Sequence, residues 1–144
     1  MDIYFVEEEK IYKGHHLVCV FVHDHRCGYI GLPQGHLLEN KDYDEIDLEI
    51  HGGLTFASNG FHFKKDGYNY YIGFDCAHIY DGYDIETILK HNPNVDIAFY
   101  ELMNQYDVTT IKTTKFVINE LENAVKQLLG EAAQWKFISM TQRL

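Results

Sequence analysis

The strongest local constraint on the fold is the pair Asp66-Gly67, which lies between two aromatic segments, residues 61–65 (FHFKK) and 68–74 (YNYYIGF). Asp-Gly favours the two-residue turn that joins adjacent antiparallel strands, and aromatic residues favour strands. The pattern therefore predicts a β-hairpin. Asp75 follows the second segment directly, so it falls on the less apolar face of that strand or just beyond its end.

More strands are predicted before the hairpin. Residues 2–7 alternate loosely between apolar and polar side chains, and residues 15–23 form the continuous apolar run of a buried strand. A polar turn over residues 24–28 and a short strand over residues 29–32 follow. Residues 54–56 read as strand again. Together these segments predict an antiparallel sheet in the N-terminal half.

The pattern changes after the hairpin. Asp84 is placed to cap a helix, and Asn92-Pro93 is placed to end it, because proline cannot continue a helix. Residues 95–103 fit either a second short helix or an extended run.

The strongest helical signal lies nearer the C-terminus, where Thr113 or Thr114 is placed as the cap. Apolar side chains recur on one stripe at positions 117, 121, 124, 125 and 128. Residues 135–138 form a last apolar run. We therefore predict a single α+β domain over residues 1–144, with an antiparallel sheet packed by C-terminal helices.

Composition and charge narrow the functional classes. The chain has a formal net charge of −10, and an acidic surface repels nucleic-acid backbones, so broad nucleic-acid binding is not expected. No apolar run approaches the roughly 20 residues that a membrane helix needs. The acidic N-terminus lacks the basic region of a signal peptide. We expect a cytoplasmic protein with no membrane partner.

Cysteine usage argues against a disulfide framework. The three cysteines have no close paired spacing, so we expect reduced thiols, with Cys19 in the core. Cys76 lies near His78, which would suit a thiolate nucleophile and its base. The adjacent carboxylate of Asp75 opposes a thiolate, so a buried structural role is the favoured interpretation of Cys76.

Two polar clusters at strand ends are the candidate site. His51, Asp75 and His78 carry the ligand types of a two-histidine, one-carboxylate metal site, or of a small hydrolase with or without a divalent metal ion. Their spacing matches no metal motif. A segment of one helical turn would bring Asp75 and His78 together.

The same clusters also suit a binding pocket. Glycines let a ligand approach the backbone, so Gly52 and Gly53 are expected to present N–H groups beside the Thr55 hydroxyl. His36, which follows a glycine, is a candidate for the rim. A small polar ligand would bind there, and nucleotide-like molecules are included because aromatic side chains stack on bases.

Four motifs in order resemble a family of small uncharacterised proteins common in bacteriophages and prophages. They are residues 28–36 (GYIGLPQGH), 41–44 (KDYD), 51–56 (HGGLTF) and 73–78 (GFDCAH). The resemblance covers about residues 26–130. That family continues to an aspartate, which Asp81 matches, and then to a C-terminal helix. Residues 79–80 are Ile-Tyr where the family has Ala-Gly.

The resemblance implies a phage accessory protein that acts in the host cytoplasm, and it adds Asp81 to the candidate ligand-binding residues. Small phage accessory proteins frequently counter host defences, either by binding a defence protein or by sequestering a nucleotide signal. A fold-level or family analogy of this kind does not establish an activity.

Three functions therefore follow from the sequence. The first is a ligand-binding protein with its pocket around the two polar clusters. The second is a small hydrolase that uses His51, Asp75 and His78. The third is an acidic inhibitor that binds a host protein through its charged surface. The residues alone do not decide whether the protein is an enzyme.

Overall fold

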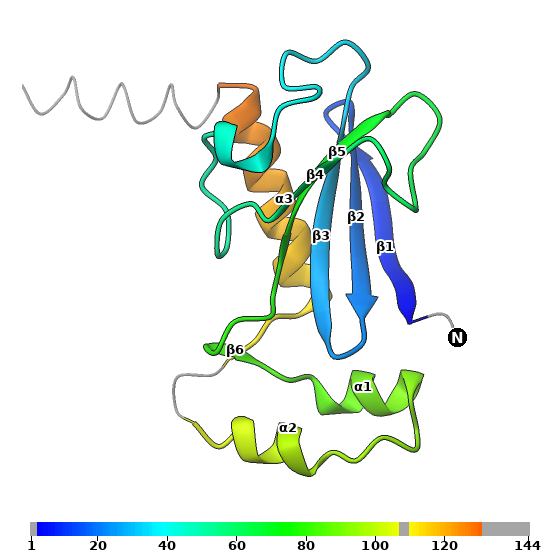
Figure 1. Cartoon of the computed structure of the whole chain (residues 1–144), viewed down its shortest axis with the longest axis vertical. Helices are drawn as coiled ribbons and strands as arrows, with labels where there is room; N and C mark the ends of the chain where they lie inside the picture. Colours follow the sequence, from blue (N-terminus) through cyan, green and yellow to red (C-terminus); the bar gives the residue numbers. More distant parts are fainter. Residues whose placement is uncertain (1–2, 107–109, 131–144) are drawn as a thin grey trace, which may run out of the picture.

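A computed structural model describes residues 3–106 and 110–130 and has an α+β architecture (Figure 1). Five antiparallel strands form the main sheet in the order β1-β2-β3-β5-β4. Their bounds are Tyr4–Tyr12, His15–Val22, His25–Leu32, Tyr70–Asp75 and Phe56–Ser58, in that same order. The predicted fold class is confirmed.

Helix α3 (Thr114–Leu128) covers one face of this sheet (Figure 1). Thr113 caps it by accepting a hydrogen bond from the backbone N–H of Phe116, as its sequence position predicted. The apolar stripe of α3 packs on alternate side chains of the central strands, including Leu17, Ile30 and Phe74. Gly28 lies under this helix, where a Cβ would come within 2.6 Å of Phe74 and 2.8 Å of Val117.

The opposite face carries a second cluster built from Val18, Val20, Phe61 and Tyr71. The predicted hairpin was wrong here, because residues 61–65 do not form a strand and β5 pairs instead with Phe56–Ser58. Phe61 stacks on Tyr71, with ring centroids 4.3 Å apart, and so covers the sheet face rather than extending the sheet. The turn at residues 66–67 persists within this longer connection.

Two strands are longer than predicted. β1 continues to Tyr12, and β3 begins at His25, so residues 24–28 are not a polar turn. The turn between β2 and β3 contains only His23 and Asp24. The polar residues at the start of β3 fit the sheet because each pairs with a carboxylate. Arg26 pairs with Glu7, and His25 pairs with Asp24.

Two short helices lie at the end of the sheet that carries the β2–β3 turn (Figure 1). Helix α1 (Ile85–His91) is capped by Asp84, whose side chain accepts from the backbone N–H of Thr87, as predicted. Residues 95–103 include α2 (Ala98–Met103), which settles the choice between helix and extended chain. The apolar run at 135–138 lies outside the described residues.

The remaining elements are short. A 3₁₀ turn spans Tyr43–Glu45, and β6 (Asp81–Gly82) pairs in parallel with β7 (Thr110–Ile111). In the part of the chain that the structure describes, no helix is long and apolar enough to cross a membrane.

Candidate functional site

The two polar clusters meet beside β6. His51 lies in a turn between the 3₁₀ segment and β4, and its backbone N–H donates to Glu120 of α3. His78 lies in the loop that follows β5. The centroids of the two imidazole rings are 5.2 Å apart, so both histidines lie on the same side of the molecule. The sequence prediction that the chain brings these clusters together agrees with this geometry.

Asp81 joins the two histidines. Its Oδ1 lies 2.9 Å from Nε2 of His51, and its Oδ2 lies 2.7 Å from Nδ1 of His78. The backbone N–H of His78 also donates to Oδ2, at 3.1 Å. The Asp81 side chain is 1% exposed, against 12% for His51 and 24% for His78. The Asp81 carboxylate is therefore the buried centre of the cluster, and His78 is its most exposed histidine.

The hydrogen bonds determine the charge of the Asp81 carboxylate. Burial alone would raise the pKa of Asp81, but donation from His51 and His78 outweighs burial and lowers the pKa below the ordinary value. Lys112 contributes a further positive charge, with Nζ 3.4 Å from Oδ1 of Asp81. Asp81 is therefore ionised at neutral pH.

Aromatic rings hold the two histidines in place. His51 is packed edge-on against Phe74, Phe116 and Tyr80, with centroids 5.2–6.1 Å away. Tyr80 lies parallel to His78, with centroids 4.9 Å apart and an interplanar angle of 1°. These contacts leave each imidazole little freedom to rotate, so the cluster is preorganised.

Asp75 lies on the outer side of His78. Its Oδ2 accepts from the Thr55 hydroxyl at 3.0 Å, and its Oδ1 accepts from the backbone N–H of Ala77 at 3.1 Å. Nε2 of His78 is 3.9 Å from Oδ1 of Asp75, which is too far for a direct hydrogen bond. The two groups are therefore close to each other but not directly bonded.

The structure thus brings together His51, Thr55, Asp75, His78 and Asp81. His36 does not join them. Leu32, four residues before it, pairs with Tyr70, at the opposite end of the β3–β5 ladder from Asp75, and the His36 ring faces His15 at 6.1 Å.

The expectation that both glycines present free backbone N–H groups was wrong for Gly53. Its N–H donates to the carbonyl of Ile50 at 2.9 Å and closes the turn that holds His51. Both glycines have positive φ angles, 69° for Gly52 and 81° for Gly53, which explains why the sequence has glycine at both positions.

Cys76 is buried in the core under α3, as the favoured interpretation predicted. Burial raises the pKa of its thiol well above the ordinary value, and the nearby carboxylate of Asp81 adds to the effect. Cys76 is therefore not available as the nucleophile of this cluster.

A divalent cation has one candidate set of ligands here. One nitrogen from each of His51 and His78 and one Asp81 oxygen lie within 4.8 Å of one another. The third predicted metal ligand, Asp75, is not part of this set. The ammonium of Lys112 beside Asp81 already neutralises the carboxylate, and it competes with a metal ion for the same oxygen.

Sequence reasoning missed Lys112, Tyr80 and Glu120. Lys112 lies 31 positions after Asp81 and reaches the cluster only because β7 pairs with β6. No local pattern signals that pairing, since each strand has two residues. Tyr80 carried a weak signal as an aromatic residue between two candidate ligands.

No family model, curated protein or solved structure matches this chain. The function is therefore inferred from the geometry of the site, and the resemblance to phage proteins stays a prediction.

The two glycines provide a matched test of the cluster. A Cβ on Gly52 would lie 2.3 Å from Cε1 and 2.4 Å from Nε2 of His78, whereas a Cβ on Gly53 would meet nothing within 4 Å. Both substitutions to alanine should cost about 1–2 kcal/mol, because alanine disfavours a left-handed backbone. Gly52→Ala should cost about 1 kcal/mol more, because it pushes His78 off Asp81. Urea denaturation of both variants measures the difference, and equal losses would contradict the His78 contact.

Proposed function

We propose that the protein binds a small polar ligand between His78 and Asp75, in a site where Gly52 leaves room for the His78 ring and Asp81 orients that ring. The observation that carries this proposal is the 3.9 Å gap between Nε2 of His78 and Oδ1 of Asp75. A bridging ligand atom within about 2.7–3.2 Å of both groups would satisfy them together.

The hydrogen-bond roles define the ligand chemistry. The tautomer that carries its proton on Nδ1 donates to ionised Asp81 and leaves Nε2 of His78 as an acceptor. The Asp75 carboxylate is also an acceptor. With this tautomer, one ligand atom that bridges Nε2 and the Asp75 oxygen must donate to both, so it carries two hydrogens, as in an amine or the exocyclic amino group of a nucleobase. The acidic protein further favours a cationic or neutral ligand over an anionic one.

A flat surface adjoins this gap. Tyr80 is 41% exposed and its ring lies parallel to His78, so it offers a face on which a planar ligand can stack. A planar molecule with an exocyclic amino group, such as an adenine or cytosine base, combines both features. Nucleosides, which carry such a base without an anionic phosphate, are therefore the first nucleotide-like ligands to test.

The resemblance to phage and prophage proteins gives this proposal its biological setting. An accessory protein with such a site would act by sequestering its ligand in the host cell, which is one way to counter a host defence. This part of the proposal rests on the resemblance alone.

A thermal-shift experiment tests the ligand class. Adenosine and cytidine should raise the melting temperature, because a ligand that binds only the folded state stabilises it. Inosine and uridine lack the exocyclic amino group and should have a much smaller effect. Asp75→Asn, which replaces an acceptor oxygen with a donor, should abolish the adenosine response.

His36→Ala is the matched control, because it removes a histidine far from the cluster and should leave the response unchanged. Equal responses to adenosine and inosine, or an unchanged response in Asp75→Asn, would reject the donor-to-acceptor arrangement. No response to any planar amine would reject the proposal.

A small hydrolase is the second candidate. A buried carboxylate that orients an imidazole through Nδ1 is also the arrangement of a general base, and the bond between Asp81 and His78 has this geometry. His78→Ala would then abolish turnover while the fold survives. Metal analysis of the purified protein separates the metal-dependent form, which would use His51, His78 and Asp81, from the metal-free form.

A further inference from the structure

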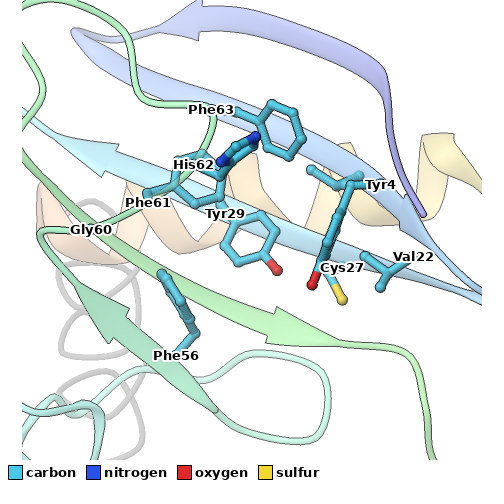
Figure 2. Close-up of a pocket in the computed structure, with 10 residues that line it drawn as sticks. Tyr4, Val22, Cys27, Tyr29, Phe56, Gly60, Phe61, His62 and Phe63 are labelled. Carbon is cyan, nitrogen blue, oxygen red and sulfur yellow. The ribbon is translucent and has the colours of Figure 1, made fainter. Parts of the chain in front are cut away.

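A pocket lies on the sheet face opposite α3, and its lining includes none of the residues His51, Asp75, His78 and Asp81. It has a volume of about 710 Å³ and a largely aromatic lining (Figure 2). The lining residues include Tyr4, Tyr29, Phe56, Phe61 and Phe63. A pocket of this size and character suits a small apolar or aromatic molecule.

The Cys27 side chain lines this pocket. Side chains alternate along β3, so His25, Cys27 and Tyr29 share the pocket face, while Arg26 and Gly28 lie on the α3 face. The Cys27 sulfur and the Tyr29 hydroxyl point the same way in the pocket (Figure 2). The residue is 7% exposed, so its thiol is reached through the hollow rather than across an open surface.

His25 connects this thiol to a carboxylate. Nδ1 of His25 lies 2.9 Å from Oδ1 of Asp24, and the Tyr100 hydroxyl donates to the other oxygen of Asp24 at 3.1 Å. The Asp24 carboxylate and then the Cys27 thiol raise the pKa of His25 to about 10. The ring is therefore a cation at neutral pH, next to a sulfur on the same strand face.

The other two cysteines lack this environment. Burial raises the pKa values of Cys19 and Cys76 well above the ordinary thiol value, and neither lines the pocket. A thiolate is stabilised by a neighbouring cation and disfavoured by burial in apolar surroundings. Asp75, the cross-strand partner of Cys27, carries a negative charge that partly opposes this effect, although Thr55 and Ala77 donate to its carboxylate.

We propose that Cys27 is a reactive thiol, paired with His25, that forms covalent adducts with apolar or aromatic α,β-unsaturated carbonyl compounds held in this pocket. The thiolate sulfur attacks the β-carbon of the electrophile. A carbon–sulfur bond forms as the carbon–carbon π bond breaks, and the electron pair moves to the carbonyl oxygen as an enolate. The α-carbon then receives a proton from the His25 imidazolium, and the product is a thioether with no leaving group.

The aromatic lining selects the electrophile. Rings at the positions of Phe61 and Phe63 offer faces and edges to a planar apolar body, and stacking favours such molecules over small polar ones. An anionic electrophile is disfavoured by the apolar lining and by the acidic protein as a whole.

Labelling with N-phenylmaleimide at pH 7 tests the proposal, with peptide mapping by mass spectrometry. Cys27 should be modified at least about tenfold faster than Cys19 or Cys76. After normalisation to the rates with free glutathione, N-phenylmaleimide should react faster than N-ethylmaleimide. His25→Gln should slow the modification of Cys27 by about tenfold while the melting temperature stays above the assay temperature.

Asp24→Asn, in the partly exposed β2–β3 turn, provides a second variant if His25→Gln does not fold, and it should slow labelling at least about threefold. Cys27→Ala should remove the fast phase. Equal rates at the three cysteines, no preference for the phenyl compound, or an unchanged rate in the folded His25 and Asp24 variants would overturn the proposal.

Discussion

Replacing Asp81 with alanine should cost about 3–5 kcal/mol of folding free energy, one of the two largest expected effects in this protein. The substitution leaves His51, His78 and the ammonium of Lys112 around a buried position with no carboxylate. Groups that lose a buried partner pay their full desolvation cost. Urea denaturation at pH 7 measures the loss, and a change below about 1 kcal/mol would show that Asp81 does not organise the cluster.

The pH dependence of this effect has a definite sign. The pKa of Asp81 is lowered in the folded protein, so its contribution is complete above the unfolded pKa of about 3.9 and is lost as the pH falls through the lower folded value. Asp81→Asn keeps the shape of the side chain and removes its titration. The difference in unfolding free energy between wild type and Asp81→Asn should therefore shrink below about pH 4, and a difference that grows there would contradict the assignment.

Local patterns were sufficient for the elements whose signals lie within one segment. The apolar run at residues 15–23 became β2, and Thr113 capped α3, because burial and capping depend on near neighbours. The pattern failed over residues 61–65. Alternating aromatic residues look the same whether they extend a strand or cover a sheet face, and only the Phe61–Tyr71 stacking decides between these outcomes.

The residue types of the candidate site could be predicted from the sequence, but the hydrogen bonds between its residues could not. His51, Asp75 and His78 were singled out correctly as neighbours, yet Asp75 is not the residue that joins the histidines. Asp81 takes that role, because the chain reverses at residues 78–81 through the bond from the N–H of Asp81 to the carbonyl of His78. That geometry depends on a loop conformation, which residue types alone do not define.

The β1–β2 pairing shows a further feature that sequence reading missed. The register shifts between Val6 and Glu8, so Glu7 occupies a β-bulge. A bulge redirects the side chain of its extra residue. Here it lets Glu7 reach Arg26 at 2.6 Å and the Thr114 hydroxyl at 3.1 Å.

Arg26→Ala should destabilise the fold by about 3–5 kcal/mol, because this guanidinium joins several elements and is only 6% exposed. It binds Glu7 of β1 and Asp84, the cap of α1, and its Nη1 donates to the carbonyl of Lys112 at 3.0 Å. The substitution therefore leaves two partly buried carboxylates without their cation and releases the segment that carries Lys112 to Asp81. Chemical denaturation measures the first effect.

Lys10 provides the matched control for a cation on the same sheet. It pairs with Glu122 at 2.8 Å, but its side chain is 41% exposed, and solvent screens exposed ion pairs. Lys10→Ala should therefore change stability little.

Arg26→Lys keeps the charge but loses the planar guanidinium that reaches Glu7, Asp84 and the Lys112 carbonyl together. Its loss of stability should therefore lie between those of Arg26→Ala and Lys10→Ala. If Arg26→Lys matched wild type, charge alone would be sufficient and the geometry of the guanidinium would not matter. If Arg26→Ala cost no more than Lys10→Ala, the network would contribute no more than a surface ion pair, and the position of Lys112 beside Asp81 would have to be maintained by the β6–β7 pairing instead.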